Sequence, residues 1–299
     1  MSGLTVAGPH LYASPLYAEA LRYLGRPVPV EAWKSFVIAR PLPAGDGEDA
    51  IGAYPMAVID PDANLAAGLA ALRSAGLVSL MVVPDPLAAP PAARLAEGFD
   101  FCRPFKTHYL IEPGAPADFT KHHRERVRRG LRRCKVDEAP LAGHLDDWAE
   151  LYAGLVDRRA IRGFADFDRA YFERLAEAPE LVALMARVEG APAAMTLWFA
   201  HGGVVYNHLT ASNATGYANG ANFALYGAAI DHFAGAGVIN LGGGAGLDDD
   251  PSDGLAAFKR GFANAEARAL ICGAVLDPDR YAALTTGRPA TPFFPAYRG

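Results

Sequence analysis

The sequence lacks the segments that direct a chain into or across a membrane. Its 299 residues contain no apolar run near the ~18 residues that a membrane span requires. Residues 1–10 have no basic segment followed by an apolar run, which argues against a signal peptide. Only three cysteines occur, Cys102, Cys134 and Cys272, and no two of them form a CxxC pair. We therefore expect free thiols, a cytoplasmic location and no membrane insertion.

Several signatures of common site chemistry are absent as well. The chain has no GxxxxGK[ST] phosphate loop, no dinucleotide-binding glycine fingerprint and no GxSxG nucleophile motif. No group of histidine, cysteine and acidic residues has the spacing of metal ligands, and no pair of acids resembles that of a glycosidase. We therefore expect no metal and no resident cofactor. The composition, 51% hydrophobic and 20% charged, is that of a globular protein and not of a disordered chain.

Positive charge is concentrated in one segment. The net charge of −5 gives no general reason to expect nucleic-acid binding. Residues 116–137, however, carry eight Lys or Arg against three acids, a charge of +5, so the remainder carries −10. Val127, Leu131 and Cys134 form a narrow helical apolar stripe in this segment. The segment is either a solvated surface helix or a phosphate-binding one, with the candidate ligands Arg124, Arg128, Arg129 and Arg132.

Apolar periodicity predicts an α/β (α+β) fold with mixed sheets flanked by helices. Asp60 is the expected N-cap of a helix, and Gly202-Gly203 the expected turn of a hairpin. We expect a first unit at residues 1–115, a basic connecting helix at 116–137 and a second unit at 138–299. Helices are expected at 16–24, 61–75, 90–97, 148–159, 167–176, 220–234 and 254–260, and strands at 33–39, 53–59, 77–83, 105–111, 181–188, 193–200, 204–211, 238–241 and 267–276.

The strongest local signal is a lysine placed in an apolar stripe. Residues 253–262 predict a short helix whose buried stripe comprises Leu255, Phe258 and Phe262. Lys259 falls inside that stripe. A lysine directed toward a core needs an acid, an oxyanion or a phosphate as its partner. Lys259 is therefore a structural ion pair, a side chain that extends outward to solvent, or a catalytic residue.

A glycine run follows a buried strand. Gly242, Gly243 and Gly244 come directly after residues 238–241. Such a run is either a tight turn or a loop whose backbone N–H groups approach a phosphate or an oxyanion. The acidic run at residues 248–250 is expected to be a solvated loop.

A polar face is expected on the strand at residues 204–210. Period two places Tyr206, His208 and Thr210 on one side of this strand. The side is either exposed or lines a cleft, and His208 is either a structural histidine or an acceptor for the proton of an attacking amine.

The order of motifs in the second half carries a resemblance. The motifs are HHR from residue 122, WAELY from 148, DRRAIRG from 157, HLTAS from 208, NGAN from 219, LGGG from 241 and GLAAFKRGF from 254. Together they resemble a subfamily of GNAT acyltransferases related to the Fem peptidyl transferases, over roughly residues 121–276. The FKRGF piece with the preceding glycine-rich strand end is the most specific part.

The resemblance implies two tandem GNAT-like domains, with the chemistry in the second. In Fem-type enzymes a lysine of the Phe-Lys segment lies at the acyl-transfer centre, and the matching residue is Lys259. Within or beside the same motifs lie the remaining expected substrate-binding residues, which are Phe258, Asn207, Asn222, Arg159 and the glycines Gly242, Gly243 and Gly244.

One motif departs from the acyl-CoA-dependent members. Those enzymes carry an Arg/Gln-x-x-Gly-x-Gly/Ala loop that holds the CoA pyrophosphate at a helix N-terminus. This chain has TGYANGAN at residues 215–222, without the basic lead and the tight spacing. Fem-like proteins also lack the loop and take an aminoacyl group from aminoacyl-tRNA. The basic helix would suit the phosphates of a tRNA acceptor stem.

The sequence therefore predicts acyl transfer to an amine, with aminoacyl-tRNA or acyl-CoA as co-substrate. Lys259 and N–H groups of the glycine run would stabilise the oxyanion, and His208 or Tyr206 would relay the proton. Two other classes stay open, a non-catalytic RNA- or ligand-binding GNAT-like protein and a structural partner protein. The acceptor also stays open between a peptidoglycan precursor, a sugar amine and a small natural-product amine.

Overall fold

The computed structural model describes residues 8–114 and 120–299, so the expected start of the basic helix at 116–119 lies outside the described residues. These residues form two compact units. The larger unit comprises residues 8–11 and the described residues of 106–267. The smaller unit comprises residues 12–105 and 268–299.

The units do not follow the expected division at residues 115 and 138. The chain passes from one unit to the other within β5 (Phe101–Ile111) and near the start of β11 (Ala265–Val275). The basic helix α4 (Lys121–Arg133) belongs to the larger unit. The C-terminal segment belongs to the smaller unit. There the Tyr297 hydroxyl lies 2.7 Å from Ser79 Oγ and donates to the buried carboxylate of Asp49.

The smaller unit is a mixed sheet with helices. Its strands follow the order β1-β2-β3-β4-β11, with β3 and β4 parallel and the other neighbours antiparallel. The strand bounds are Arg26–Val30, Ser35–Pro41, Glu48–Gly52 and Leu77–Val82 for β1 to β4. The helices are α1 (Pro15–Ala20), α2 (Leu65–Ser74), α3 (Ala92–Gly98) and α10 (Pro278–Thr285), with 3-10 turns at Leu21–Tyr23, Glu31–Trp33 and Ala296–Arg298.

Two local expectations in the smaller unit are wrong. Residues 53–59 contribute only an isolated bridge, Ala57 to Pro84, while the strand β3 ends at Gly52. Pro55, which has no N–H for a ladder, follows a cis peptide bond in this stretch. The next helix begins four residues later than expected, because the Asn64 side chain caps it and Asp60 instead forms a turn with the N–H of Asp62.

The expectation of free thiols is wrong for two of the three cysteines. Cys102 in β5 and Cys272 in β11 form a disulfide within the smaller unit, although 170 residues separate them. Their Cα atoms lie 4.2 Å apart. Only Cys134 is free, and it is buried. The sequence spacing gave no indication of this pair, because the pairing depends on which strands become neighbours.

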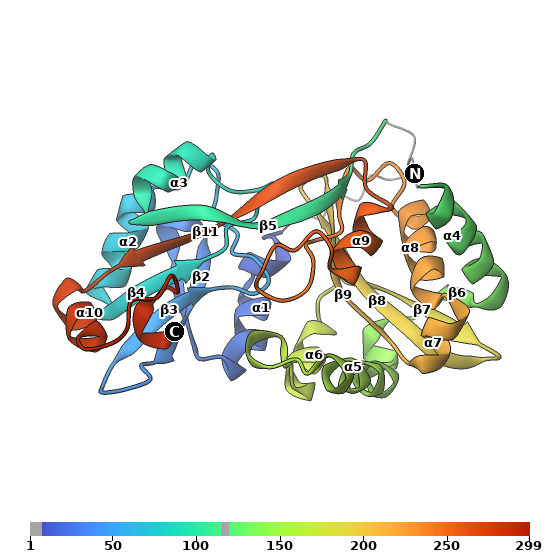
Figure 1. Cartoon of the computed structure of the whole chain (residues 1–299), viewed down its shortest axis with the longest axis horizontal. Helices are drawn as coiled ribbons and strands as arrows, with labels where there is room; N and C mark the ends of the chain where they lie inside the picture. The colour runs from blue at the N-terminus through green and yellow to red at the C-terminus, as the bar shows by residue number, and fades with distance from the viewer. Residues whose placement is uncertain (1–7, 115–119) are drawn as a thin grey trace. The chain divides into compact units, whose positions relative to one another are not determined.

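The larger unit has a six-strand sheet with the order β5-β10-β9-β8-β7-β6. Figure 1 labels β5, β6, β7, β8 and β9 of this sheet. β10 runs parallel to β9, and the other neighbours are antiparallel. The strands are β6 (Lys135–Glu138), β7 (Val182–Val188), β8 (Ala191–His201), β9 (Val204–Ser212) and β10 (Val238–Asn240). The helices are α4, α5 (Leu145–Arg159), α6 (Arg169–Leu175), α7 (Ala214–Asn219), α8 (Ala221–His232) and α9 (Gly254–Arg260), with 3-10 turns at Leu141–Gly143 and Gly163–Ala165.

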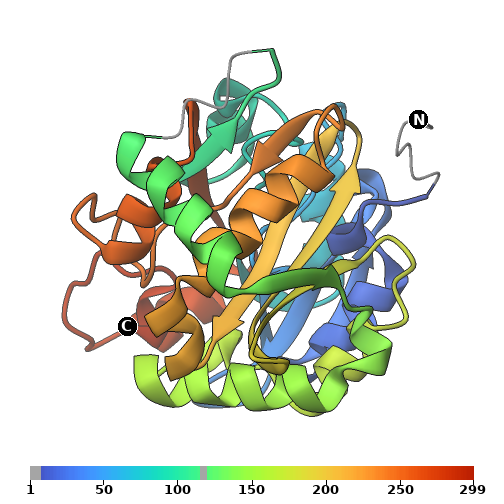
Figure 2. The same ribbon diagram turned by 90° about the vertical axis from the view of Figure 1, so that its right-hand side faces the viewer.

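Helices α4 and α8 lie side by side on one face of this sheet (Figure 2). Glycine permits the close approach, since a Cβ on Gly130 would come 2.6 Å from the carbonyl oxygen of Gly220. A Cβ on Gly227 would likewise come 2.6 Å from Val127. The buried face of α4 accordingly follows His123, Val127 and Gly130, and Leu131, which is 45% exposed, is not part of the buried stripe that we expected.

The predicted α/β class, with mixed sheets flanked by helices, is confirmed by these elements. In the part of the chain that the structure describes, no helix is long and apolar enough to span a membrane.

Candidate active site

Lys259 lies in the short helix α9 of the larger unit. The Asp253 side chain caps this helix, which ends at Gly261. Lys259 is only 8% exposed, and its Nζ donates a hydrogen bond of 2.8 Å to the carbonyl oxygen of Gly243. No carboxylate among the described residues forms an ion pair with it. Of the three alternatives for Lys259, the structure therefore excludes the ion pair and the side chain that extends outward to solvent.

Burial sets the protonation of this lysine. Loss of water lowers the pKa of Lys259 to about 7, with Asp253 opposing the shift and Lys106 adding to it. Both the ammonium and the amine are therefore populated near neutral pH. One expectation for this helix is wrong: Leu255 is 39% exposed, and Ala256 takes its place in the buried face.

The glycine run forms a loop against Lys259. The N–H of Gly242 donates to Asn240 Oδ1 over 2.9 Å, and the carbonyl of Gly243 accepts from Lys259. Gly242 has a φ of +77°, which favours glycine. A Cβ on Gly244 would come 3.0 Å from the Asp253 carboxylate. Among the described residues, the N–H groups of Gly243 and Gly244 have no hydrogen-bond partner, so they are available to an oxyanion.

Two residues that the sequence analysis missed, His108 and Asn240, lie beside Lys259 and the glycine run and complete what we call the Lys259 cluster. His108 in β5 is 7% exposed, and its Nδ1 lies 3.2 Å from Asn240 Oδ1. Asn240 in β10 is 1% exposed, and its Nδ2 has no partner among the described residues. Burial, followed by the positive charge of Lys259, lowers the pKa of His108 to about 4, so the imidazole is neutral at pH 7. Asn240 was detectable in principle, as a polar residue inside an apolar strand.

The acidic run closes the same loop against β5. Asp248, Asp249 and Asp250 are exposed, as expected. The Asp249 carboxylate nevertheless accepts from the N–H and the hydroxyl of Thr107, over 2.9 and 2.8 Å. Lys106 Nζ donates to the carbonyl oxygen of Ala245 over 3.0 Å. The acidic run is therefore exposed to solvent and is also held against β5 by these hydrogen bonds.

A bulge in β9 breaks the expected polar face. Leu197 pairs with Leu209 and Trp198 with Asn207, so His208 is an extra residue in the strand. Beyond the bulge the side-chain alternation is inverted, and Thr210 joins Asn207 on the side of Thr196. The expectation that Thr210 shares a face with Tyr206 and His208 is therefore wrong.

The two expected proton relays lie outside the Lys259 cluster. Tyr206 is buried and stacks on Phe199, with ring centroids 4.9 Å apart. His208 Nε2 lies 2.7 Å from the Tyr171 hydroxyl, and burial lowers its pKa to about 3. The interactions of Lys259 with described residues involve neither side chain. A catalytic role for Tyr206 or His208 gains no support from this geometry.

The remaining expected substrate-binding residues differ in position. The Tyr226 hydroxyl donates to Asn207 Oδ1 over 2.8 Å, and the Tyr226 ring packs on Phe258, which precedes Lys259. Asn207 and Phe258 are thus joined to the cluster through one tyrosine. Asn222 accepts a hydrogen bond from Ser212. Arg159 is exposed in the last turn of α5 and bonds to no described residue.

The basic helix presents a row of arginines to solvent. Arg124, Arg128, Arg129 and Arg132 are all exposed. Within the described residues, Arg128, Arg129 and Arg132 have no ion-pair partner. His123 Nε2 lies 2.9 Å from the carbonyl oxygen of Phe258, so α4 is attached directly to the helix of Lys259.

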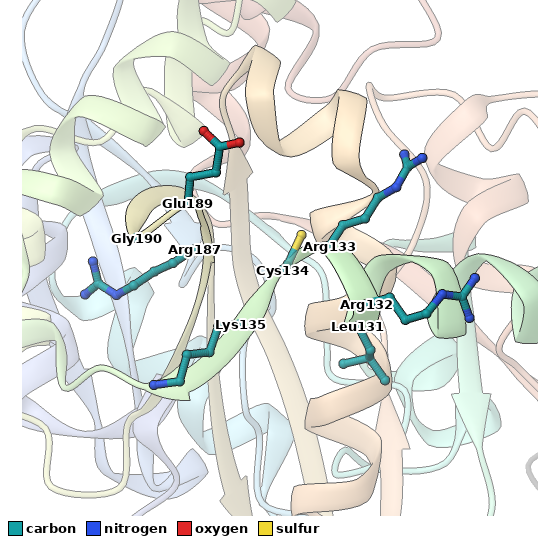
Figure 3. A pocket seen from close by; sticks show the side chains of 8 residues that line it. All are labelled: Leu131, Arg132, Arg133, Cys134, Lys135, Arg187, Glu189 and Gly190. Atoms are coloured by element: carbon teal, nitrogen blue, oxygen red, sulfur yellow. The ribbon is translucent and has the colours of Figure 1, made fainter.

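An open pocket of about 410 Å³ lies at the C-terminal end of α4. Arg132 and Arg133 lie on one side of it and Lys135 and Arg187 on the other, with Glu189 as its acid (Figure 3). The four cationic side chains diverge and do not converge on one point. This arrangement suits a row of phosphates better than a single anion. Elsewhere in residues 8–114 and 120–299, no group of three or more His, Cys, Asp or Glu could hold a metal ion.

Comparison with known proteins assigns the fold. Residues 121–260 match the family model described as an acetyltransferase (GNAT) domain. The C-terminal domain (DUF2156) of a protein assigned as a lysylphosphatidylglycerol synthetase from Agrobacterium fabrum has a TM-score of 0.63 at 16% identity, over 91% of this chain and 90% of that one. FemX has a TM-score of 0.63 at 15% identity, over 92% and 94%. L-PGS from Bacillus licheniformis has a TM-score of 0.56 at 12% identity, over 87% of this chain and 92% of that one.

These similarities confirm the predicted GNAT-type fold related to the Fem transferases. The family match over residues 121–260, together with the shared fold, supports acyl transfer as the chemistry of this domain. No curated protein sequence matches it.

Proposed function

We propose that the protein transfers an aminoacyl group from aminoacyl-tRNA to an amine and forms an amide. One observation carries the proposal: α4 presents Arg128, Arg129 and Arg132 to solvent, without an ion-pair partner among the described residues, and is attached through His123 to the helix of the buried Lys259. FemX and the lysylphosphatidylglycerol synthetase domain have the same fold, which makes their substrate classes the first to test.

Lys259 and the glycine loop supply the electrostatic part of the reaction. The Lys259 ammonium donates one hydrogen bond to Gly243 and keeps two further N–H groups for a ligand. The unpaired N–H groups of Gly243 and Gly244 belong to the same loop. Donors held in place before the reaction stabilise a tetrahedral oxyanion without reorganising. We assign this role to Lys259 and the loop, with no metal or cofactor.

The arginine row supplies the binding of the donor. A tRNA acceptor stem presents a phosphate at each nucleotide, and Arg pairs with phosphate oxygens by two parallel hydrogen bonds. Arg128, Arg129 and Arg132 have no competing acid among the described residues. The cationic pocket beyond Arg132 extends the same surface.

The first turn of α8 argues against acyl-CoA as the donor. In an acyl-CoA enzyme the pyrophosphate needs free N–H groups at such a helix start. Here α4 approaches the start of α8 closely, because Gly130 packs against Gly220 and Ala224. The preceding residues form the short helix α7, not an open loop. Acyl-CoA stays the alternative donor that an experiment must exclude.

Binding of charged total tRNA, CoA and acetyl-CoA at low and high salt tests the donor. We expect saturable, salt-sensitive binding of aminoacyl-tRNA and no binding of CoA. Transfer is then followed as a product that resists mild alkali, because an amide survives conditions that cleave an aminoacyl ester. Tight CoA binding would replace the proposed donor by acyl-CoA. Binding of tRNA without any transfer would favour a non-catalytic RNA-binding protein.

A further inference from the structure

We propose that His108, held in one tautomer by Asn240, is the catalytic base that takes the proton from the acceptor amine. This inference rests on the proposed acyl transfer and adds the proton acceptor to it. Three geometric facts support it: the bonds of Asn240, the accessible nitrogen of His108, and the position of both residues beside Gly243.

The tautomer of His108 follows from the backbone. The Gly242 N–H donates to the side-chain oxygen of Asn240, so this atom is an acceptor. The same oxygen lies 3.2 Å from His108 Nδ1. Because two acceptors cannot bond to each other, Nδ1 of the neutral ring carries the hydrogen. Nε2 is then left with the lone pair that a general base requires.

The Nε2 atom is free to receive a proton. Among the described residues it has no hydrogen-bond partner, and it is not one of the fully enclosed unpaired atoms. His208 differs, because its Nε2 is already engaged by Tyr171. In this cluster His108 is therefore the histidine whose acceptor nitrogen is available.

His108 and Lys259 flank the same peptide. Lys259 donates to the carbonyl of Gly243, and a Cβ on Gly243 would come 3.7 Å from Cδ2 of His108. An oxyanion bound at the loop N–H groups and an amine beside His108 would therefore be neighbours. The charged groups that act on the ring are Lys259, Lys106 and Asp249. Burial and the two lysines keep the imidazole unprotonated at neutral pH, which preserves it as a base.

The proton balance of the step is complete. The amine nitrogen attacks the ester carbonyl carbon, a C–N bond forms, and the carbonyl electrons become an oxyanion held by Lys259 and the loop. His108 Nε2 takes one proton from the nitrogen. On collapse the ester C–O bond breaks, and the imidazolium returns this proton to the departing ribose oxygen. The products are an amide and a free hydroxyl, with His108 neutral again.

The experiment compares His108→Gln with the wild type and with His232→Gln, a histidine in the last turn of α8. Charged total tRNA is the donor probe, and glycinamide and glucosamine are the acceptor probes. We expect His108→Gln to lower kcat by about 10²–10⁴-fold. The Kd for aminoacyl-tRNA stays unchanged, and His232→Gln matches the wild type. Turnover of a His108→Gly variant is expected to recover when imidazole is added.

Asn240→Asp provides a second test that does not depend on losing activity. A carboxylate at this position would favour the imidazolium, so the pKa of His108 rises. The acid limb of the pH–rate profile should then move to higher pH, which a purely structural role would not cause. This variant also keeps the proposal testable if His108→Gln fails to fold.

The outcomes separate the role of His108 as the base from the proposed acyl transfer. Full turnover in His108→Gln, or an unmoved acid limb in Asn240→Asp, overturns His108 as the base and leaves acyl transfer intact. Transfer from acetyl-CoA in place of aminoacyl-tRNA changes the donor, and the same His108 comparison applies. Absence of transfer by the wild type from either donor overturns the proposed function and this inference with it.

Discussion

His123 Nε2 lies 2.9 Å from the carbonyl oxygen of Phe258, the residue that precedes Lys259. Through this contact the basic helix α4 is attached to the helix of the candidate catalytic lysine. The ring also packs edge-on against Phe262, with centroids 4.8 Å apart. A Cβ on Gly261 would lie 2.0 Å from this ring, so the glycine leaves the space that the histidine occupies.

We therefore expect Gly261→Ala to destabilise the larger unit by about 1–3 kcal/mol, as overpacking does. Gly261 has a φ of −68°, so the penalty is steric and not one of backbone conformation. Gly254→Ala is the matched control, because nothing lies within 4 Å of its added Cβ. Urea unfolding of the three proteins measures the difference. Equal stability of Gly261→Ala and the wild type would contradict the described contact.

Lys259→Ala should lower turnover by about 10²–10³-fold while the protein stays folded, because it removes a charged donor from the oxyanion. Arg260→Ala is the control, since Arg260 is exposed and its side chain bonds, among the described residues, only to the carbonyl of Pro251. Steady-state transfer and circular dichroism of both variants give the comparison. A Lys259→Ala variant that keeps its turnover would remove Lys259 from the mechanism.

The triple variant Arg128→Ala, Arg129→Ala and Arg132→Ala should weaken tRNA binding. Each lost phosphate contact is expected to reduce the slope of log K against log salt by about 0.7–0.9. Arg174→Ala removes an exposed arginine that is paired with Glu177, and it should leave the slope unchanged. Filter binding across a salt series measures both. If the triple variant binds with the wild-type slope, the donor docks elsewhere.

Stability should fall as the pH drops below about 6.5, because buried histidines must then accept protons on unfolding. Burial lowers the pKa of His208 to about 3, so between that value and 6.5 the unfolded chain binds the additional proton. The folded state loses on the order of 1.4 kcal/mol per pH unit for each such group in this window. Above pH 6.5 the effect is absent.

His208→Gln should make this pH dependence shallower, and unfolding by urea between pH 6.5 and about 4.5 measures it. His10 and His108 contribute in the same direction, since burial also lowers their pKa values, to about 3 and about 4. The variant therefore keeps part of the slope. An identical slope in variant and wild type would contradict a buried neutral His208.

Much of the fold was accessible from local pattern. The apolar run at residues 77–83 is the buried strand β4, and Gly202 and Gly203 form the hairpin turn with φ values of 58° and 79°. Helix α9 and its buried lysine were also predicted from spacing. In each case the evidence lies within a dozen residues, where periodicity and turn chemistry act.

The predictions that failed concern contacts between segments that lie far apart in the sequence. The Cys102–Cys272 disulfide depends on strand pairing, and the exposure of Leu131 depends on how closely α4 approaches α8. The bulge at His208 depends on the register of β8. None of these is encoded in the alternation of a single segment.

By itself the sequence determined the mixed α/β class, the concentration of positive charge on one helix and the buried position of Lys259. The tertiary structure alone decided which residues surround that lysine. It joined His108 of β5 to Asn240 of β10 and set His208 against Tyr171. The physical reason is that a side chain's chemistry depends on its hydrogen-bond partner and its loss of water. Both are fixed only when strands far apart in the chain become neighbours.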